Sequence, residues 1–154
     1  MTLTFTLNGD RVQTLIDPTA SLLETLRACG IHSIRQGCDT ENCGICTVWV
    51  DDTPVLSCSY PAARAEGKRV TTVEGVREEA KELMDALAAE GADQCGFCSP
   101  GFIMSALAML RELDHPSEDE IRRYLSGNLC RCTGYASQAR ALRRVYDGRA
   151  KEWI

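Results

Sequence analysis

Long apolar runs are missing from this chain of 154 residues. A membrane-spanning helix needs about 20 consecutive apolar residues, and the apolar stretches here are far shorter, so we expect no membrane span. The N-terminus, MTLTFTLNGD, lacks a basic region followed by an apolar core, and it has no twin-arginine pair. These absences predict that the chain has no export signal and lies in the cytoplasm, where thiols stay reduced.

An excess of basic charge is also absent. The formal net charge is −5, the sequence pI is about 5.1, and aromatic residues make up only 6% of the chain. Nucleic-acid binding usually needs a basic surface with interleaved aromatic residues, so we expect no nucleic-acid partner. The charge is uneven, because residues 1–114 carry a net charge of −8 and residues 115–154 a net charge of +3. The mildly basic tail predicts a solvated helix face or a surface that docks another protein.

Cysteine is abundant: there are nine, and eight of them fall into two groups of four. The first group has the spacing Cys-x4-Cys-x2-Cys-x11-Cys and consists of Cys38, Cys43, Cys46 and Cys58. The second has the spacing Cys-x2-Cys-x31-Cys-x1-Cys and consists of Cys95, Cys98, Cys130 and Cys132. The first group opens with the cysteine run of plant-type [2Fe–2S] ferredoxins. Because each group is one complete set of four thiolates, the sequence predicts two iron–sulfur clusters and a role in electron transfer.

Disulfides and structural zinc are alternative interpretations of the same cysteines. Disulfide frameworks belong mainly to short secreted chains, and an odd number of cysteines fits them poorly. Structural zinc favours paired Cys-x2-Cys knuckles, whereas Cys-x4-Cys-x2-Cys on one loop and Cys-x1-Cys are unusual for it. Iron is therefore the preferred metal. The ninth cysteine, Cys29, ends a helical pattern and is interpreted as a small buried hydrophobic residue.

The first 75 residues predict a sheet with one helix. The predicted strands are 3–7, 12–16, 47–50, 54–57 and 69–73. Asn8-Gly9 indicates a tight turn between the first two strands, and Trp49 is expected in the strand core. Ser21-x-x-Glu24 is a capping box that starts a helix, and Gly30 ends it. This half of the chain is expected to be α+β.

From Val76 onward the apolar residues recur with a helical period. The predicted helices are 78–90, a helix that begins at Pro100, 121–126 and 135–146. Leu83, Met84 and Leu87 are expected on one face of the first helix. Ser117-x-x-Glu120 forms a second capping box. This change of period, with one cysteine group on each side of it, predicts two domains, 1–75 and 76–154. Trp153 is interpreted as part of the tail or of a partner contact.

Glycines stand beside the cysteines. Gly37, Gly44 and Gly96 are expected in left-handed or bulged turns that aim backbone N–H groups at sulfur. Cys98 and Cys132 come shortly before predicted helices, and the N-terminus of a helix favours an anionic cluster.

Three segments carry a family resemblance. They are Gln36-Gly-Cys-Asp-Thr-Glu-Asn-Cys-Gly-Ile-Cys-Thr-Val48, Gln94-Cys-Gly-Phe-Cys-Ser-Pro-Gly101 and Gly127-Asn-Leu-Cys-Arg-Cys-Thr-Gly-Tyr135. In this order, and with both cysteine sets complete, they closely resemble the [2Fe–2S] subunits of the molybdenum hydroxylases. This is the family of xanthine dehydrogenase, aldehyde oxidoreductase and 4-hydroxybenzoyl-CoA reductase. The resemblance covers nearly the whole chain.

The resemblance implies a ferredoxin-like β-grasp domain that holds the first cysteine group, followed by an all-α four-helix-bundle [2Fe–2S] domain that holds the second. A large partner subunit would hold molybdopterin, in its cytosine dinucleotide form, and a medium partner subunit would hold FAD. The second group would lie next to the pterin, with Gln94 as a hydrogen-bond partner of that cofactor, and the first group would lie toward the flavin.

By the same resemblance the chain would relay electrons as the iron–sulfur subunit of a multi-subunit oxidoreductase, in a hetero-oligomer such as a dimer of heterotrimers. It would hold no catalytic residue and no substrate site of its own. The substrate stays open among purines, other N-heterocycles, aldehydes, carbon monoxide and aromatic thioesters.

Three residues depart from the usual pattern of this family. Glu41 stands where a small residue is frequent, Ile45 where alanine is common, and Gln138 where an aliphatic residue is usual. A carboxylate at position 41 that points inward is expected to lower the reduction potential of the first cluster, because negative charge disfavours the reduced form. A polar glutamine at position 138, in place of an aliphatic residue, affects how the last predicted helix packs.

Two other functions fit part of the pattern. One is a free-standing two-cluster carrier that shuttles electrons between separate enzymes, and the other is a zinc-stabilised interaction module. A shuttle needs only one small domain, whereas two cluster domains and a glutamine on the pterin side suit a fixed complex. The sequence therefore favours the subunit of a complex.

Overall fold

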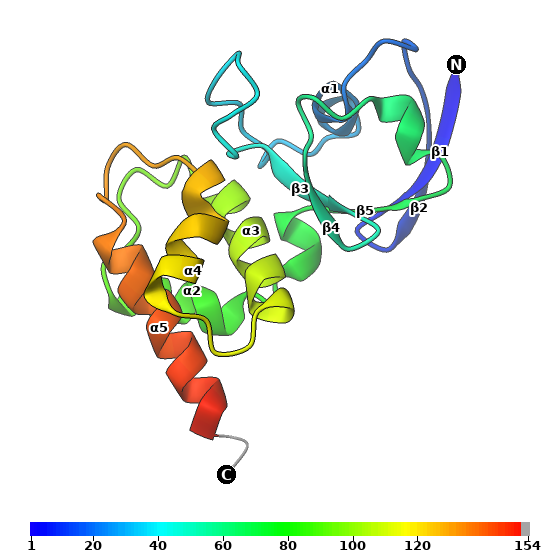
Figure 1. Ribbon diagram of the computed structural model, residues 1–154. Helices are drawn as coiled ribbons and strands as arrows, with labels where there is room; N and C mark the ends of the chain where they lie inside the picture. The colour runs from blue at the N-terminus through cyan, green and yellow to red at the C-terminus, as the bar shows by residue number, and fades with distance from the viewer. Residues whose placement is uncertain (152–154) are drawn as a thin grey trace.

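The computed structural model describes residues 1–151, and the side chains of residues 1–148. One mixed sheet contains five strands, in the order β2-β1-β5-β3-β4 (Figure 1). The strands are β1 (Thr2–Leu7), β2 (Asp10–Leu15), β3 (Thr47–Val50), β4 (Thr53–Leu56) and β5 (Arg69–Thr71). β1 and β5 are parallel and the other neighbours are antiparallel. Together with the helices this sheet confirms the α+β class.

Local sequence accounts for the first hairpin and the helix that follows. Asn8 and Gly9 have φ of 50° and 96°, which is the left-handed backbone that a two-residue turn between twisted strands requires. Helix α1 (Leu22–Ala28) begins with both hydrogen bonds of the capping box between Ser21 and Glu24. Its buried leucines pack on the inward side chains of β1 and form the core of this half of the molecule.

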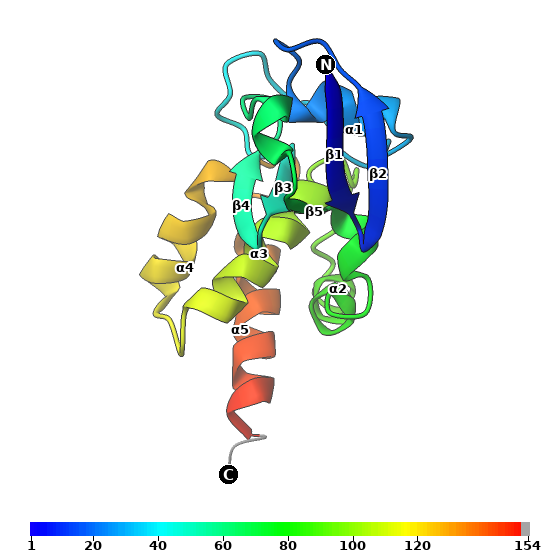
Figure 2. The ribbon, with the colours of Figure 1, turned by 90° about the vertical axis from the view of Figure 1, so that its right-hand side faces the viewer.

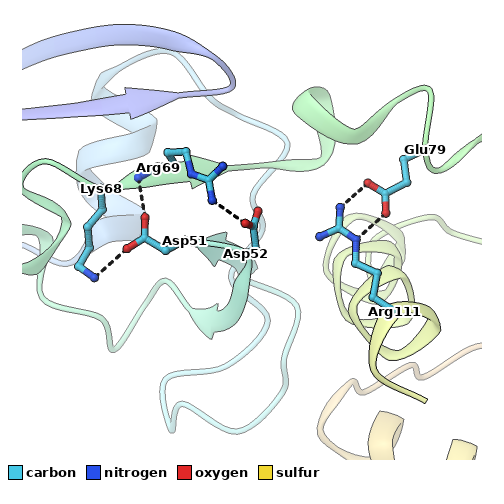
Figure 3. Close-up of polar contacts among 6 residues, drawn as sticks. All are labelled: Asp51, Asp52, Lys68, Arg69, Glu79 and Arg111. Carbon is cyan, nitrogen blue, oxygen red and sulfur yellow. Dashed lines mark hydrogen bonds and ion pairs between the residues drawn. The ribbon is translucent and has the colours of Figure 1, made fainter. Parts of the chain in front are cut away.

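The second hairpin is tied to β5 by polar contacts (Figure 3). Its turn residues Asp51 and Asp52 both have left-handed backbone, with φ of 49° and 66°. Asp51 accepts a hydrogen bond of 3.0 Å from the backbone N–H of Arg69 and lies 2.9 Å from the Lys68 ammonium group, and Asp52 pairs with the Arg69 guanidinium. These ion pairs are solvent-exposed, so they fix the turn more than they stabilise the fold.

The remaining chain is helical. The helices are α2 (Lys81–Ala89), α3 (Ser99–Glu112), α4 (Glu118–Tyr124) and α5 (Ala136–Lys151), with short 3-10 helices at Ala62–Ala65, Val73–Val76 and Leu125–Gly127. Every residue of α3 from Gly101 to Leu110 is buried, because the sheet lies on one side of this helix and the other helices lie around it (Figure 2). α3 is therefore the centre of the helical half.

Trp49 joins the two halves. β3 is buried on both faces, with Val48 in the core beside α1 and Trp49 in the core of the helical half. The Trp49 indole N–H donates a hydrogen bond of 2.9 Å to the carbonyl oxygen of Met104 in α3. The Arg111 guanidinium lies 4.1 Å from the ring centre and is held by a two-pronged contact with Glu79 (Figure 3).

Some expectations need correction. Met84 is 45% exposed, because the buried face of α2 consists of Leu83, Ala86 and Leu87, and a helix turns Met84 about 100° away from Leu83. α2 is also shorter than predicted. Tyr135 has φ of 68°, so α5 begins one residue later, at Ala136. Trp153 and its neighbours at 152–154 lie outside the described residues.

Among the described residues, no helix is both long enough and apolar enough to cross a bilayer.

Candidate metal centres

The first thiol set lies where the loop between α1 and β3 meets the end of the second hairpin. Cys46 directly precedes β3, and one residue separates Cys58 from the end of β4. Because Thr47 pairs with Leu56 across the hairpin, these two cysteines come side by side and their thiols are in contact. The thiols of Cys38 and Cys43, earlier in the same loop, form a second contacting pair, and Cys38 is close enough to Cys58 to affect the pKa of its thiol.

Backbone N–H groups of the loop stabilise the thiolate form of Cys38, which is the form that binds a metal. The backbone N–H groups of Asn42, Cys43 and Thr40 all donate toward its sulfur, and they lower the pKa of the Cys38 thiol to about 6. In contrast, burial and then contact with Cys46 raise the pKa of the Cys58 thiol to about 12, with a small contribution from the Glu41 carboxylate. Bound iron would favour the thiolate at every position, since a coordinating thiol is deprotonated.

The second thiol set joins the loop before α3 to the loop before α5. The Cys95 and Cys132 sulfurs are 3.4 Å apart, and the Cys98 and Cys130 thiols are in contact. The Thr133 hydroxyl donates a hydrogen bond of 3.2 Å to the Cys130 sulfur. Cys98 is the N-cap residue of α3, and burial raises the pKa of its thiol to about 12.

Both sets thus consist of two contacting pairs. Within the part of the chain that the structure describes, no group of three or more cysteine, histidine or carboxylate side chains surrounds a position for a single metal ion. A [2Fe–2S] cluster has two irons, each with two protein ligands. Two pairs of thiols are the donor arrangement that such a cluster requires, so the residues fit the group. The assignment of these eight cysteines as ligands stays a prediction.

The two sets meet directly through their loops. The Leu129 N–H donates a hydrogen bond of 2.8 Å to the carbonyl oxygen of Cys43. The buried Asn128 amide donates to the carbonyl oxygens of Gly44 and Gly101, at 3.1 Å and 3.4 Å. Sequence reasoning did not assign a role to Asn128. The only signal was its place in the segment that carries the second cysteine pair.

Glycines make this close approach possible. A Cβ on Gly44 would lie 2.1 Å from the carbonyl oxygen of Gly127, and one on Gly101 would lie 2.5 Å from that of Ile45. Gly44 and Gly96 have φ of 70° and 73°, as the expected turns require. Gly37 does not have left-handed backbone, and it is needed for space instead, because a Cβ there would lie 2.5 Å from the Ile45 side chain.

Exposed apolar side chains lie in the two segments that carry the second set. Phe97, Leu129 and Tyr135 are 38%, 47% and 42% exposed, next to the exposed Cys95 and Cys132. We call these three residues the apolar rim. The Arg35 guanidinium, from the loop of the first set, lies 5.3 Å from the centre of the Phe97 ring. Gln94, which precedes Cys95, is exposed, and within the described residues its amide makes no hydrogen bond.

Comparison with known families identifies two binding domains. Residues 5–72 match the family model described as a 2Fe-2S iron-sulfur cluster binding domain, and residues 72–143 match the model described as a [2Fe-2S] binding domain. The chain is therefore an iron–sulfur protein with two [2Fe–2S]-binding domains.

Comparison with individual proteins narrows the class. The chain is 48% identical over 142 residues to the xanthine dehydrogenase iron-sulfur-binding subunit of Escherichia coli O157:H7, covering 88% of this chain and 87% of that protein. It is 39% identical over 150 residues to the nicotinate dehydrogenase small FeS subunit of Eubacterium barkeri, with 96% of each chain covered. A chain in the crystal structure of quinoline 2-oxidoreductase from Pseudomonas putida 86 matches with a TM-score of 0.89 and 36% identity, covering 100% of this chain and 98% of that one. The chain belongs to the family of [2Fe–2S] subunits of the molybdenum hydroxylases.

Proposed function

We propose that this chain is the electron-transfer subunit of a molybdenum-containing oxidoreductase. In this proposal a large partner subunit oxidises the substrate at molybdopterin, in its cytosine dinucleotide form, and a medium subunit with FAD or another acceptor receives the electrons. When bound, each of the two clusters accepts and releases one electron. The task of this chain is to hold the clusters at fixed positions between the partners.

The contact between the two loops is the observation that carries this proposal. Cys43 belongs to the first set, and its carbonyl oxygen accepts the hydrogen bond from the N–H of Leu129, the residue before Cys130 of the second set. One hydrogen bond and a few covalent bonds thus connect the two sets. A carrier that used its clusters independently would not require this buried, glycine-lined contact.

We propose the domains 1–75 and 76–154, a β-grasp domain followed by a four-helix bundle. Two separate hydrophobic clusters support this division: one lies between α1 and the sheet, and the other lies around α3. The two family models divide the chain at residue 72.

The apolar rim supports a particular orientation of this chain in the complex, with the second thiol set toward the large subunit. Exposed large apolar side chains grouped around a functional site are typical of a surface that another protein covers. The rim lies in the segments that carry the second set, so this set would face the large subunit, with Gln94 available to hydrogen-bond the pterin. The first set would face the flavin. The hetero-oligomer, with a dimer of heterotrimers as one form, and the cytoplasmic location stay predictions.

Metal and flavin analysis of the complex purified from the native host tests the function. About four irons per chain, the content of two [2Fe–2S] clusters, are expected together with molybdenum and FAD. Iron without molybdenum or partner subunits would instead support the free-standing carrier, and zinc in place of iron would contradict the proposal.

The ligand sets are tested by Cys130→Ser, with Cys29→Ser as the matched control. Cys130→Ser should lower the iron content to about two per chain, remove one cluster signal and stop turnover with the natural acceptor. Cys29→Ser should keep both clusters, because Cys29 lies beside the sheet core and not in either set. Both cluster signals and a full rate in Cys130→Ser would rule out the assignment.

A further inference from the structure

A groove runs between α4 and α5, with a volume of about 750 Å³. Its walls include the apolar side chains of Phe102, Ile121, Leu125 and Leu142. Tyr135 and Gln138 lie at the end near the second thiol set, and arginines lie along the edges. Neither the relay of electrons nor the thiol sets uses this groove.

The polar groups of the groove that have no partner are hydrogen-bond donors. Gln138 is only 4% exposed, and its side-chain carbonyl oxygen lies 3.3 Å from the Thr133 hydroxyl, whose one proton it shares with the Cys130 sulfur. Its amide nitrogen donates to no group among the described residues and is not itself fully buried. The Tyr135 hydroxyl oxygen accepts from the Cys130 N–H at 2.8 Å, which leaves its own proton free. Arg143 is exposed and has no carboxylate partner within the side chains that the structure describes.

The other charged groups of the groove are already paired. Glu118, an acidic residue of the groove, pairs with Arg122. Arg140 pairs with Glu90. Among the described residues, a ligand therefore meets apolar walls, the Gln138 amide donor, the Tyr135 hydroxyl donor and the unpaired Arg143 guanidinium. A ligand that is complementary to these groups of the groove combines an apolar side chain with carboxylate oxygens close to it.

We propose that the groove receives a segment of the large, molybdenum-bearing partner subunit that combines an apolar side chain with an aspartate or glutamate. This inference rests on the proposed function. Tyr135 belongs both to the groove and to the apolar rim, so a partner that covers the rim also covers the mouth of the groove. Charge complementarity with Arg143 and continuity with the rim favour this occupant.

A charge reversal tests the proposal. Arg143→Glu is compared with Arg123→Glu, which changes the net charge equally on an exposed helix residue outside the groove. The tagged chain is purified with the molybdenum-containing subunit from the native host and washed with increasing salt. Arg143→Glu should lower the molybdenum retained per iron at least about tenfold relative to Arg123→Glu. Equal retention in the two variants overturns the proposal.

Cross-linking identifies the occupant. Benzoylphenylalanine in place of Ser126, an exposed residue of the groove, should form a photo-cross-link to a segment of the molybdenum-bearing subunit that contains both apolar and acidic residues. A cross-link to the flavin subunit, to a second copy of this chain or to a segment without a carboxylate overturns the proposal. So does a small carboxylic acid found in the purified complex in place of a cross-link.

Failure of this inference is distinguishable from failure of the proposed function. Iron analysis and visible spectra of both variants report whether the clusters and the fold are intact. A wild-type complex that lacks molybdenum refutes the proposed function, and with it the occupant. A wild-type complex with molybdenum that is indifferent to Arg143→Glu refutes the groove alone.

Discussion

Glu41 is the residue whose charge bears most directly on the first thiol set. It lies in the cysteine loop with φ of 58°, in the left-handed region, and its carboxylate is close enough to contribute to the raised pKa of the Cys58 thiol. The same negative charge disfavours electron uptake by a cluster bound there.

Glu41→Gln is therefore expected to raise the reduction potential of the first cluster by roughly 10–40 mV, the range of a solvent-screened charge. A redox titration followed by electron paramagnetic resonance measures this shift, and high salt should reduce it. Asp10→Asn, which removes an exposed carboxylate at the first residue of β2, should leave the potential unchanged. A lower potential in Glu41→Gln would contradict the electrostatic argument.

Trp49 is the second residue with an effect beyond its own strand. It is 1% exposed, and it combines apolar burial, a hydrogen bond to Met104 and the contact with Arg111. Trp49→Phe should lower the free energy of unfolding by about 2 kcal/mol, because it removes the hydrogen bond and part of the buried area.

Chemical unfolding of the iron-loaded protein, followed by circular dichroism, measures this change. Tyr60→Phe is the control, since it also removes a hydrogen bond to a carbonyl oxygen, here that of Arg64, but this bond is solvent-exposed although the Tyr60 ring is partly buried. Its expected effect is within about 0.5 kcal/mol. Equal effects of the two substitutions would mean that Trp49 does not join the halves energetically.

At the scale of elements, the features that depend on local sequence were predictable. Both capping boxes form as expected, and so does the tight turn at Asn8-Gly9. Each depends on residues within four positions of one another, and the sequence contains that information in full. The cysteine spacings likewise indicated two sets.

Features that depend on distant segments were not predictable. Periodicity did not reveal that Met84 faces solvent or that Trp49 joins the core around α3, since both depend on which element packs opposite. The contact of Asn128 with Gly44 brings together residues 84 apart, and the pairing of Cys95 with Cys132 brings together residues 37 apart. No local pattern in the sequence encodes that approach.

The contact between the cysteine loops predicts the effect of Gly44→Ala. Gly67→Ala is a closely matched control, because both glycines have φ of 70° but a Cβ on Gly67 meets nothing within 4 Å. Gly67→Ala should cost about 1 kcal/mol of stability, the cost of left-handed backbone. Gly44→Ala should cost about 3 kcal/mol or more, because its Cβ collides with the backbone of Gly127.

Iron content, cluster spectra and chemical unfolding of the two variants separate these costs. Because the collision lies between the loops, Gly44→Ala should disturb the spectra of both clusters, while Gly67→Ala disturbs neither. A disturbance confined to the first cluster would show that the loops adjust independently.

At the scale of the whole molecule, the thiol loops have little regular structure of their own. The segments around the cysteines connect helices and strands, and each half of the chain has a modest core. Bound clusters should therefore contribute to folding as well as to electron transfer.

Removal of iron with a chelator under anaerobic conditions should lower the melting temperature by roughly 10 °C, as the loss of several kcal/mol does in a protein of this size. Circular dichroism measures the change, and reconstitution with iron and sulfide should reverse it. Incubation with the iron-saturated chelator is the control. An unchanged melting temperature in the iron-free protein would mean that the loops are ordered without metal.

The backbone hydrogen bond from Leu129 to Cys43 also limits how far the two halves are exchangeable modules. A chimera that combines the sheet half of one relative with the helical half of another can tolerate many different side chains at the junction, because this bond joins main-chain atoms. It cannot tolerate a larger residue at Gly44 or Gly101, where the two backbones touch. Recombination between relatives should therefore succeed or fail according to these two glycines, whatever the overall similarity of the parents.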